Sequence, residues 1–223
     1  ALLDLAAWAF PSPLERPALE GRMDEDLVEV EVNDEEGFLA QVIHTTVDEF
    51  AGKTSIFRIF RGAVPSDHIV SNANHGSSER LGALYALRGK QRTPIASAVT
   101  GDILGVSKLK VTQTGDTLGT SDERIVLDGV RFLPPMMSYV IRPVSKGDAD
   151  KIKTALERML EEDPTLSVHT DDLTHQLVLS GMGQVQLDMA IDRMKRKYRV
   201  RVHTSLPPVP YRETLRAAVT RIE

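Results

Sequence analysis

The sequence contains no cysteine, which excludes disulfide bonds and thiolate metal sites. It also contains no apolar run near the roughly 20 residues that span a bilayer. The apolar segment 1–10 lacks the basic start of a secretion signal and has no initial methionine, so we interpret it as the end of an upstream domain. We expect a cytoplasmic protein that makes no membrane contact and continues beyond both ends of this sequence.

The usual motifs of catalysis and cofactor binding are missing as well. There is no glycine-rich phosphate loop of the G-x-x-x-x-G-K-[ST] type, no H-E-x-x-H pair and no EF-hand spacing. Six histidines are scattered without ligand spacing, and no acid, base and nucleophile form a constellation. We therefore expect no catalytic residue, no metal site and no cofactor within this chain.

What is present suits a folded protein of one large or two ordinary domains. Hydrophobic residues make up 41% of the 223 residues, and the formal net charge is −5. A chain of that charge is not a polycation, so any contact with nucleic acid must be local.

Proline clusters divide the sequence. Pro11, Pro13 and Pro17 predict an extended linker, because proline fixes its own φ and disfavours helix at the preceding residue. Further clusters stand at 134–135 and 206–210. The boundaries that follow are 1–33 (a helix and linker), 34–133, 134–206, and 207–223 (the start of another element).

Short apolar segments between glycine turns dominate residues 34–132 and predict an all-β barrel or sandwich. The expected strands are 38–45, 54–60, 68–71, 79–87, 102–106 and 125–130. Residues 93–99 have room for only a short helix.

After Pro135 the pattern alternates between strand and helix. We expect a strand at 138–144, a helix at 147–162, a hairpin of 166–170 and 176–180, a helix at 184–198 and a strand at 199–203. The order β-α-β-β-α-β is typical of the ferredoxin-like fold.

The second predicted helix is apolar on one face and cationic beyond it. Leu187, Ile191, Met194 and Tyr198 recur at three- and four-residue steps. The basic edge consists of Arg193, Lys195, Arg196, Lys197, Arg199 and Arg201. We expect Arg199 and Arg201 to share one strand face and to continue the helical patch. This edge is either a solvated surface or a salt-sensitive contact for RNA phosphates.

Two further segments of the second half allow alternative interpretations. Gly181, Met182 and Gly183 precede the basic helix, and form either a tight turn or an anion site at the helix N-terminus. Glu161, Glu162 and Asp163 end the other helix, where acids oppose the helix dipole. They either contact a basic partner or are simply solvated.

Several segments together resemble translation elongation factor G. In the second half they are 161–165, 176–183, 188–198 and 211–214. In the first half they are 52–54, 57–62, 79–81, 101–103 and 114–118, which look like the β-barrel of the second domain of that family. Their order and spacing cover nearly the whole chain.

The resemblance implies a parent GTPase that moves transfer RNA and messenger RNA through the ribosome. Residues 1–33 would end its GTPase domain and form the exit linker, 34–133 would be the second domain, 134–206 the third, and 207–223 the start of the fourth. This chain would then not hydrolyse GTP, because GTP and Mg²⁺ would bind the GTPase domain. The implied partners are ribosomal RNA, small-subunit proteins and that GTPase domain, and not DNA. The basic edge would contact RNA, and the interdomain coupling residues would be Glu161, Glu162, Asp163, Gly181, Met182, Gly183 and Gln184.

Four departures from the family pattern suggest a divergent paralogue. The family usually has an acid where Gln184 stands, a histidine at Gln186 and a glycine at His175, and residues 87–92 replace its histidine- and asparagine-rich loop. One alternative is a ribosome-protection or recycling factor of the same superfamily. Another is a stand-alone ligand-binding or regulatory protein of two domains, because fold alone does not decide function.

Overall fold

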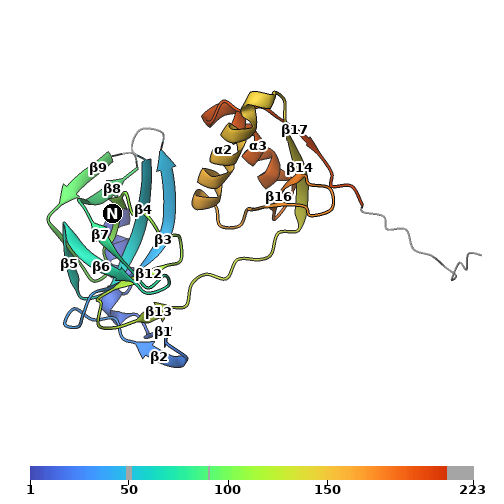
Figure 1. Cartoon of the computed structure of the whole chain (residues 1–223). Helices are drawn as coiled ribbons and strands as arrows, with labels where there is room; N and C mark the ends of the chain where they lie inside the picture. Colours follow the sequence, from blue (N-terminus) through green and yellow to red (C-terminus); the bar gives the residue numbers. More distant parts are fainter. Residues whose placement is uncertain (49–51, 90, 210–223) are drawn as a thin grey trace, which may run out of the picture. The chain divides into compact units, whose positions relative to one another are not determined.

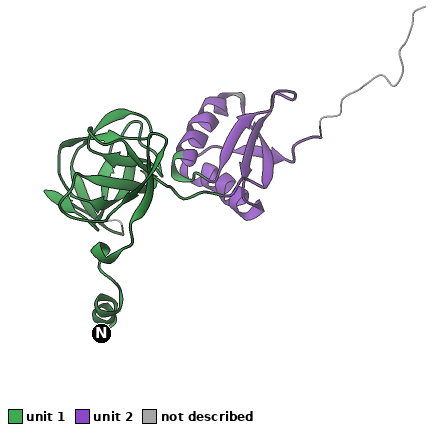
Figure 2. Cartoon of the chain, turned by 90° about the horizontal axis from the view of Figure 1, so that it is seen from below, with its two compact units in different colours: residues 1–132, 161–164 green, residues 133–160, 165–223 purple. Residues whose placement is uncertain are grey.

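The computed structural model describes residues 1–48, 52–89 and 91–209. Their contacts define two compact units (Figure 2). The first contains residues 1–132 together with 161–164, and the second contains 133–160 and the chain from residue 165 onward. Of the expected fourth-domain start at 207–223, residues 210–223 lie outside the described residues, and with them the segment 211–214.

The first unit is a β-barrel preceded by a short helix, α1 (Leu2–Ala9), and a 3₁₀ turn, η1 (Pro13–Glu15). Its main sheet is antiparallel, in the order β7 (Ser77–Leu81), β6 (His68–Asn72), β12 (Thr117–Gly119), β3 (Leu39–Asp48), β4 (Gly52–Arg61), β11 (Ile103–Ser107), β8 (Leu84–Arg88) and β9 (Gln91–Ile95) (Figure 1). A second sheet pairs β5 (Ala63–Pro65) with β10 (Ser97–Val99). A third has the order β13 (Ile125–Leu127), β1 (Leu19–Met23) and β2 (Asp26–Val30).

Alternation of side chains along the strands builds the barrel core. In β4, Phe57 and Ile59 are fully buried, whereas Ile56 and Arg58 are half-buried. Phe57 meets Phe38 edge to face, with ring centroids 6.5 Å apart. The predicted β-barrel is confirmed, because the period of two expected from the sequence places one set of side chains inside.

Three details of the barrel differ from expectation. Residues 79–87 form parts of two strands, β7 and β8, and residues 93–99 lie in β9 and β10 instead of a helix. Pro94 is tolerated in β9 because that strand lies at the edge of the sheet, where a missing N–H breaks no ladder. Strands β1 and β2 were not expected at all, and β1 pairs with β13, about 100 residues further along the chain.

The second unit has the expected ferredoxin-like fold. Its elements are β14 (Met137–Pro143), a 3₁₀ turn η2 (Lys146–Asp148), α2 (Ala149–Glu162), β15 (Ser167–Thr170), β16 (Leu177–Gly181), α3 (Gln184–Lys197) and β17 (Val202–Ser205). The sheet is antiparallel in the order β15-β16-β14-β17. Both helices lie on one face of this sheet (Figure 1).

The apolar faces of α2 and α3 form the core of the second unit. Leu187 and Met194 of α3 are fully buried, as is Leu179 of β16, and Met159 of α2 is 1% exposed. The same cluster includes Ile191 and Tyr198, packed at its border. This confirms the amphipathic pattern of the second helix. The opposite side of α3 is therefore left for other contacts.

The hairpin between β15 and β16 contains the position where the resemblance led us to expect a glycine. His175 has φ of 54°, a left-handed conformation that glycine adopts more easily than other residues. The Asp171 carboxylate holds the turn by accepting hydrogen bonds from the Leu173 N–H at 3.1 Å and the Thr174 N–H at 2.7 Å. These bonds, with one from the Thr174 hydroxyl, lower the pKa of Asp171.

Candidate functional site

The basic edge forms at the C-terminal end of α3 and in the segment before β17. All six cations lie there, between residues 193 and 201. Lys195, Arg196, Arg199 and Arg201 are exposed, and Arg193 and Lys197 are half-buried. Cations in the last turn of a helix also complement its dipole, by about 0.3–1 kcal/mol each. Part of this charge therefore has a structural explanation that needs no partner.

The six cations are not equally available to a ligand. The Arg196 Nε atom lies 2.6 Å from the Asp192 Oδ2 atom, one turn earlier in α3. The Lys197 Nζ atom lies 5.5 Å from the centroid of the Tyr198 ring. Among the described residues, Lys195, Arg199 and Arg201 form no ion pair, so their charges face solvent without a neutralising partner.

Arg199 and Arg201 do not lie on a strand, so the expectation that they share a strand face was wrong. β17 begins only at Val202, and Arg199 has φ of 53°. It is the left-handed residue that ends α3, after which the Val200 N–H donates to the Met194 carbonyl at 3.1 Å. Val200 is buried, which anchors this turn. The sequence pattern missed it because glycine is the usual residue at such a position.

The glycine turn connects β16 to α3 and is held by a side chain of the helix itself. The Met182 N–H donates to the Gln186 Oε1 atom at 2.7 Å. A β-carbon on Gly181 would lie 2.7 Å from that same oxygen, so Gly181 is the residue that admits the Gln186 side chain. One backbone donor of the turn is thus already occupied, which favours the tight-turn interpretation over an anion site.

Gln186 also connects the turn to the loop after α2. Its Nε2 atom donates to the Thr165 Oγ1 atom at 2.6 Å. Thr165 follows the acidic end of α2, where Glu161 and Glu162 are the last helical residues and Asp163 comes next. Gln186 was not a predicted site residue, although its departure from the family pattern was the signal that marked it.

One side chain therefore links the glycine turn to Thr165, which follows the acidic segment in the sequence. Residues 181–184 form the turn and the start of α3, and residues 161–163 precede Thr165 by only a few positions in the sequence. The amide of Gln186 makes hydrogen bonds at both of its ends, one to the turn and one to Thr165. Gln184 is exposed at the first position of α3.

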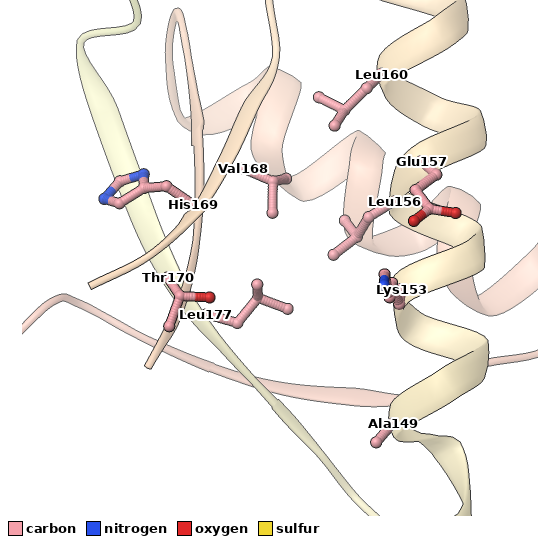
Figure 3. Close-up of a pocket in the computed structure, with 9 residues that line it drawn as sticks. All are labelled: Ala149, Lys153, Leu156, Glu157, Leu160, Val168, His169, Thr170 and Leu177. Atoms are coloured by element: carbon pink, nitrogen blue, oxygen red, sulfur yellow. The ribbon is translucent and has the colours of Figure 1, made fainter. Parts of the chain in front are cut away.

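A separate apolar groove lies between α2 and the edge strand β15 (Figure 3). It has a volume of about 540 Å³. Leu156, Leu160, Val168 and Leu177 supply its apolar side chains, and Lys153, Glu157, His169 and Thr170 its polar ones. These side chains include no nucleophile paired with a base. Within the described parts of the chain, no group of three histidine or acidic residues is placed to hold a metal ion.

Comparisons with known proteins match each of the two units to a family model. Residues 37–121 match the family model described as elongation factor G domain 2, and residues 132–206 match that of elongation factor G, domain III. The chain belongs to the elongation factor G family. The β-barrel is its domain 2 and the ferredoxin-like unit its domain III, in the family's own order.

A solved structure agrees with this assignment. A crystal structure of a Thermus thermophilus protein superposes with a TM-score of 0.77 and 30% sequence identity. The match covers 95% of this chain but only 29% of that protein. The predicted resemblance to elongation factor G is thus confirmed for both domains. Among the residues that the structure describes, no helix is long and apolar enough to cross a bilayer.

Proposed function

We propose that this chain is the ribosome-binding and coupling part of an elongation factor G-like GTPase that promotes movement of transfer RNA and messenger RNA. The observation that carries the proposal is the presence of domain 2 and domain III of the family, consecutively, in one chain. The proposed partners are ribosomal RNA, small-subunit proteins and the GTPase domain of the parent protein. A cytoplasmic location follows from that role.

The two functions fall on different parts of the chain. RNA contact is the role of the basic edge, whose exposed cations Lys195, Arg199 and Arg201 lack ion-pair partners among the described residues. Coupling is the role of the turn at 181–184, which Gln186 joins to Thr165, and of the acidic segment at 161–163. Coupling requires contacts that differ between two states of the parent protein. A turn held by one side chain is suited to report such a difference.

Co-sedimentation with 70S ribosomes at increasing salt tests the RNA contact. The chain is expected to pellet with ribosomes at low salt and to be released as salt rises, because phosphate contacts release counterions. The double variant Lys195→Ala/Arg201→Ala should dissociate at lower salt than the unaltered chain.

The matched control is Arg124→Ala/Arg131→Ala, which removes the same charge from exposed positions in the first unit. If both double variants behave alike, the basic edge is not the contact. Absence of binding at low salt, or binding that salt does not weaken, would overturn the proposal that this chain binds ribosomes through phosphates.

A further inference from the structure

The second unit contains a small groove between α2 and the end of α3. Its volume is about 320 Å³, and it is lined by Asp150, Lys151, Thr154, Ala155, Arg158 and Tyr198. The first five recur at three- and four-residue steps along α2, so they share one face of that helix. Tyr198, the residue after α3, comes from the other side. The groove therefore lies beside the basic edge.

The α2 side of the groove carries two cations and one acid. Arg158 is exposed and forms no ion pair within the described residues. Lys151 has its Nζ atom 3.2 Å from the Asp148 Oδ1 atom, an exposed pair of little strength. Asp150 stands in the first turn of α2, where the helix dipole stabilises its charge. Arg158 is thus the cation of this wall most available to a ligand.

The α3 side of the groove is formed by Tyr198. Lys197 and Arg199 flank Tyr198 in the sequence, and the Lys197 ammonium lies against the Tyr198 ring. Arg199 is exposed in its left-handed conformation. The groove thus joins two elements distant in the sequence, with Arg158 and Lys151 on α2 and Tyr198 after α3, which periodicity along α3 alone did not reveal.

We propose that this groove binds the phosphodiester backbone of RNA, with Arg158 and Lys151 on its α2 wall and Tyr198 on the other, next in the sequence to Lys197 and Arg199 of the basic edge. The proposal rests on the proposed function and names the ligand chemistry of its RNA contact. Arginine suits phosphate because its guanidinium presents several donors in a planar fork. Seven helical positions separate Lys151 from Arg158, a rise of about 10 Å. That spacing reaches phosphates of different nucleotides rather than a single ion.

Binding of a fluorescent 12-nucleotide poly(U) RNA, measured by anisotropy over a salt series, tests the groove. Arg158→Ala should weaken binding roughly two- to fivefold at 0.1 M salt, the range of an exposed charge contact. It should also reduce the slope of log affinity against log salt by about 0.7, the contribution of one phosphate contact in a single strand. Arg124→Ala, an exposed arginine of the first unit, is the control and should change neither quantity.

Arg199→Gly is a second variant, and it tests the proposal without disturbing the fold. It removes the basic-edge cation that follows Tyr198 in the sequence, and it supplies the residue that adopts positive φ most easily, so the end of α3 is not strained. It should weaken RNA binding in the same direction as Arg158→Ala without lowering the melting temperature. A 12-residue polyglutamate competitor should displace the RNA poorly, because carboxylates on a flexible chain do not reproduce the phosphate spacing.

The outcomes separate the groove from the proposed function. If the chain binds ribosomes and RNA but Arg158→Ala binds RNA as Arg124→Ala does, the groove is not the RNA site. The proposal of ribosome binding is then unaffected. Equal competition by polyglutamate would show a general polyanion surface and overturn the assignment to RNA. If the unaltered chain binds neither RNA nor ribosomes at low salt, both proposals fail.

Discussion

Gln186 is the residue whose side chain joins the glycine turn before α3 to the loop after α2. It accepts from the Met182 N–H and donates to the Thr165 hydroxyl, and its carbonyl fills the space where a β-carbon of residue 181 would stand. A glycine at 181 and a glutamine at 186 therefore fit each other sterically. Where the resemblance led us to expect a histidine, the glutamine both accepts a hydrogen bond from the turn and donates one to the loop after α2.

Replacing Gln186 by alanine should loosen the turn without unfolding the domain. One hydrogen bond of this kind contributes about 1 kcal/mol, so amide exchange at Met182 should rise roughly fivefold. Hydrogen exchange followed by NMR measures this at the single amide. Gln184→Ala is the matched control, because Gln184 is exposed in the same turn of α3 and makes no side-chain hydrogen bond among the described residues. Equal exchange in the two variants would contradict the role of Gln186.

Among the secondary-structure elements, one carboxylate connects strand β7 to the segment after β11. Glu79 is 7% exposed and accepts hydrogen bonds from the backbone N–H groups of Lys110 at 2.8 Å, Val111 at 2.9 Å and Thr112 at 2.8 Å. The Thr112 hydroxyl adds a fourth at 2.8 Å. Burial alone would raise the pKa of Glu79, but these four bonds outweigh it and hold the pKa below its usual value.

Glu79→Gln should therefore destabilise the barrel in a pH-dependent way. At pH 7 we expect a loss of about 1–3 kcal/mol, because an amide cannot accept four hydrogen bonds as the carboxylate does. The pKa of Glu79 is lower in the folded than in the unfolded chain. The carboxylate therefore adds to the free energy of unfolding above the unfolded pKa, and this contribution disappears as pH falls through the folded pKa. The difference between the two proteins should shrink below about pH 4.

Urea unfolding followed by circular dichroism between pH 3 and 7 measures that difference. Glu29→Gln on strand β2 is the control, since Glu29 is exposed and has no ion pair in the described structure. If the free energy of unfolding of Glu79→Gln differed from that of the unaltered chain by the same amount across this pH range, ionisation of Glu79 would not be what holds the segment after β11.

At the scale of the whole molecule, an acidic chain carries a local cluster of positive charge. The formal net charge is −5, yet the end of α3 and the adjoining groove are basic. A local basic surface on an acidic chain favours one orientation toward an anionic partner, because the remainder is repelled. Salt should then weaken association more steeply than the net charge suggests.

We further propose that nucleotide handling belongs to the GTPase domain of the parent protein and not to this chain. The sequence has no glycine-rich phosphate loop, and the chain matches domains 2 and III of the family. Isothermal titration with GTP and Mg²⁺ should give no saturable heat at micromolar protein, with GDP titrated in parallel. A binding isotherm with either nucleotide would refute this expectation.

The two folds and their order were predictable from the order of residues alone. Alternation at Phe57 and Ile59 and the helical spacing of Leu187 and Met194 identify buried faces, because such periods arise within a single strand or helix. These patterns remain visible without knowledge of any partner element. The resemblance to elongation factor G likewise rested on segments that follow one another along the chain.

Which side chains meet could be learned only from the folded chain. The pairing of β1 with β13, the bridge from Gln186 to Thr165, and the groove shared by Arg158 and Tyr198 each join residues that are distant in the sequence. The left-handed turn at Arg199 accompanies the burial of Val200, which is equally a matter of packing. Local periodicity specifies which face of an element is buried, whereas the partner across that face is selected by packing of the whole domain.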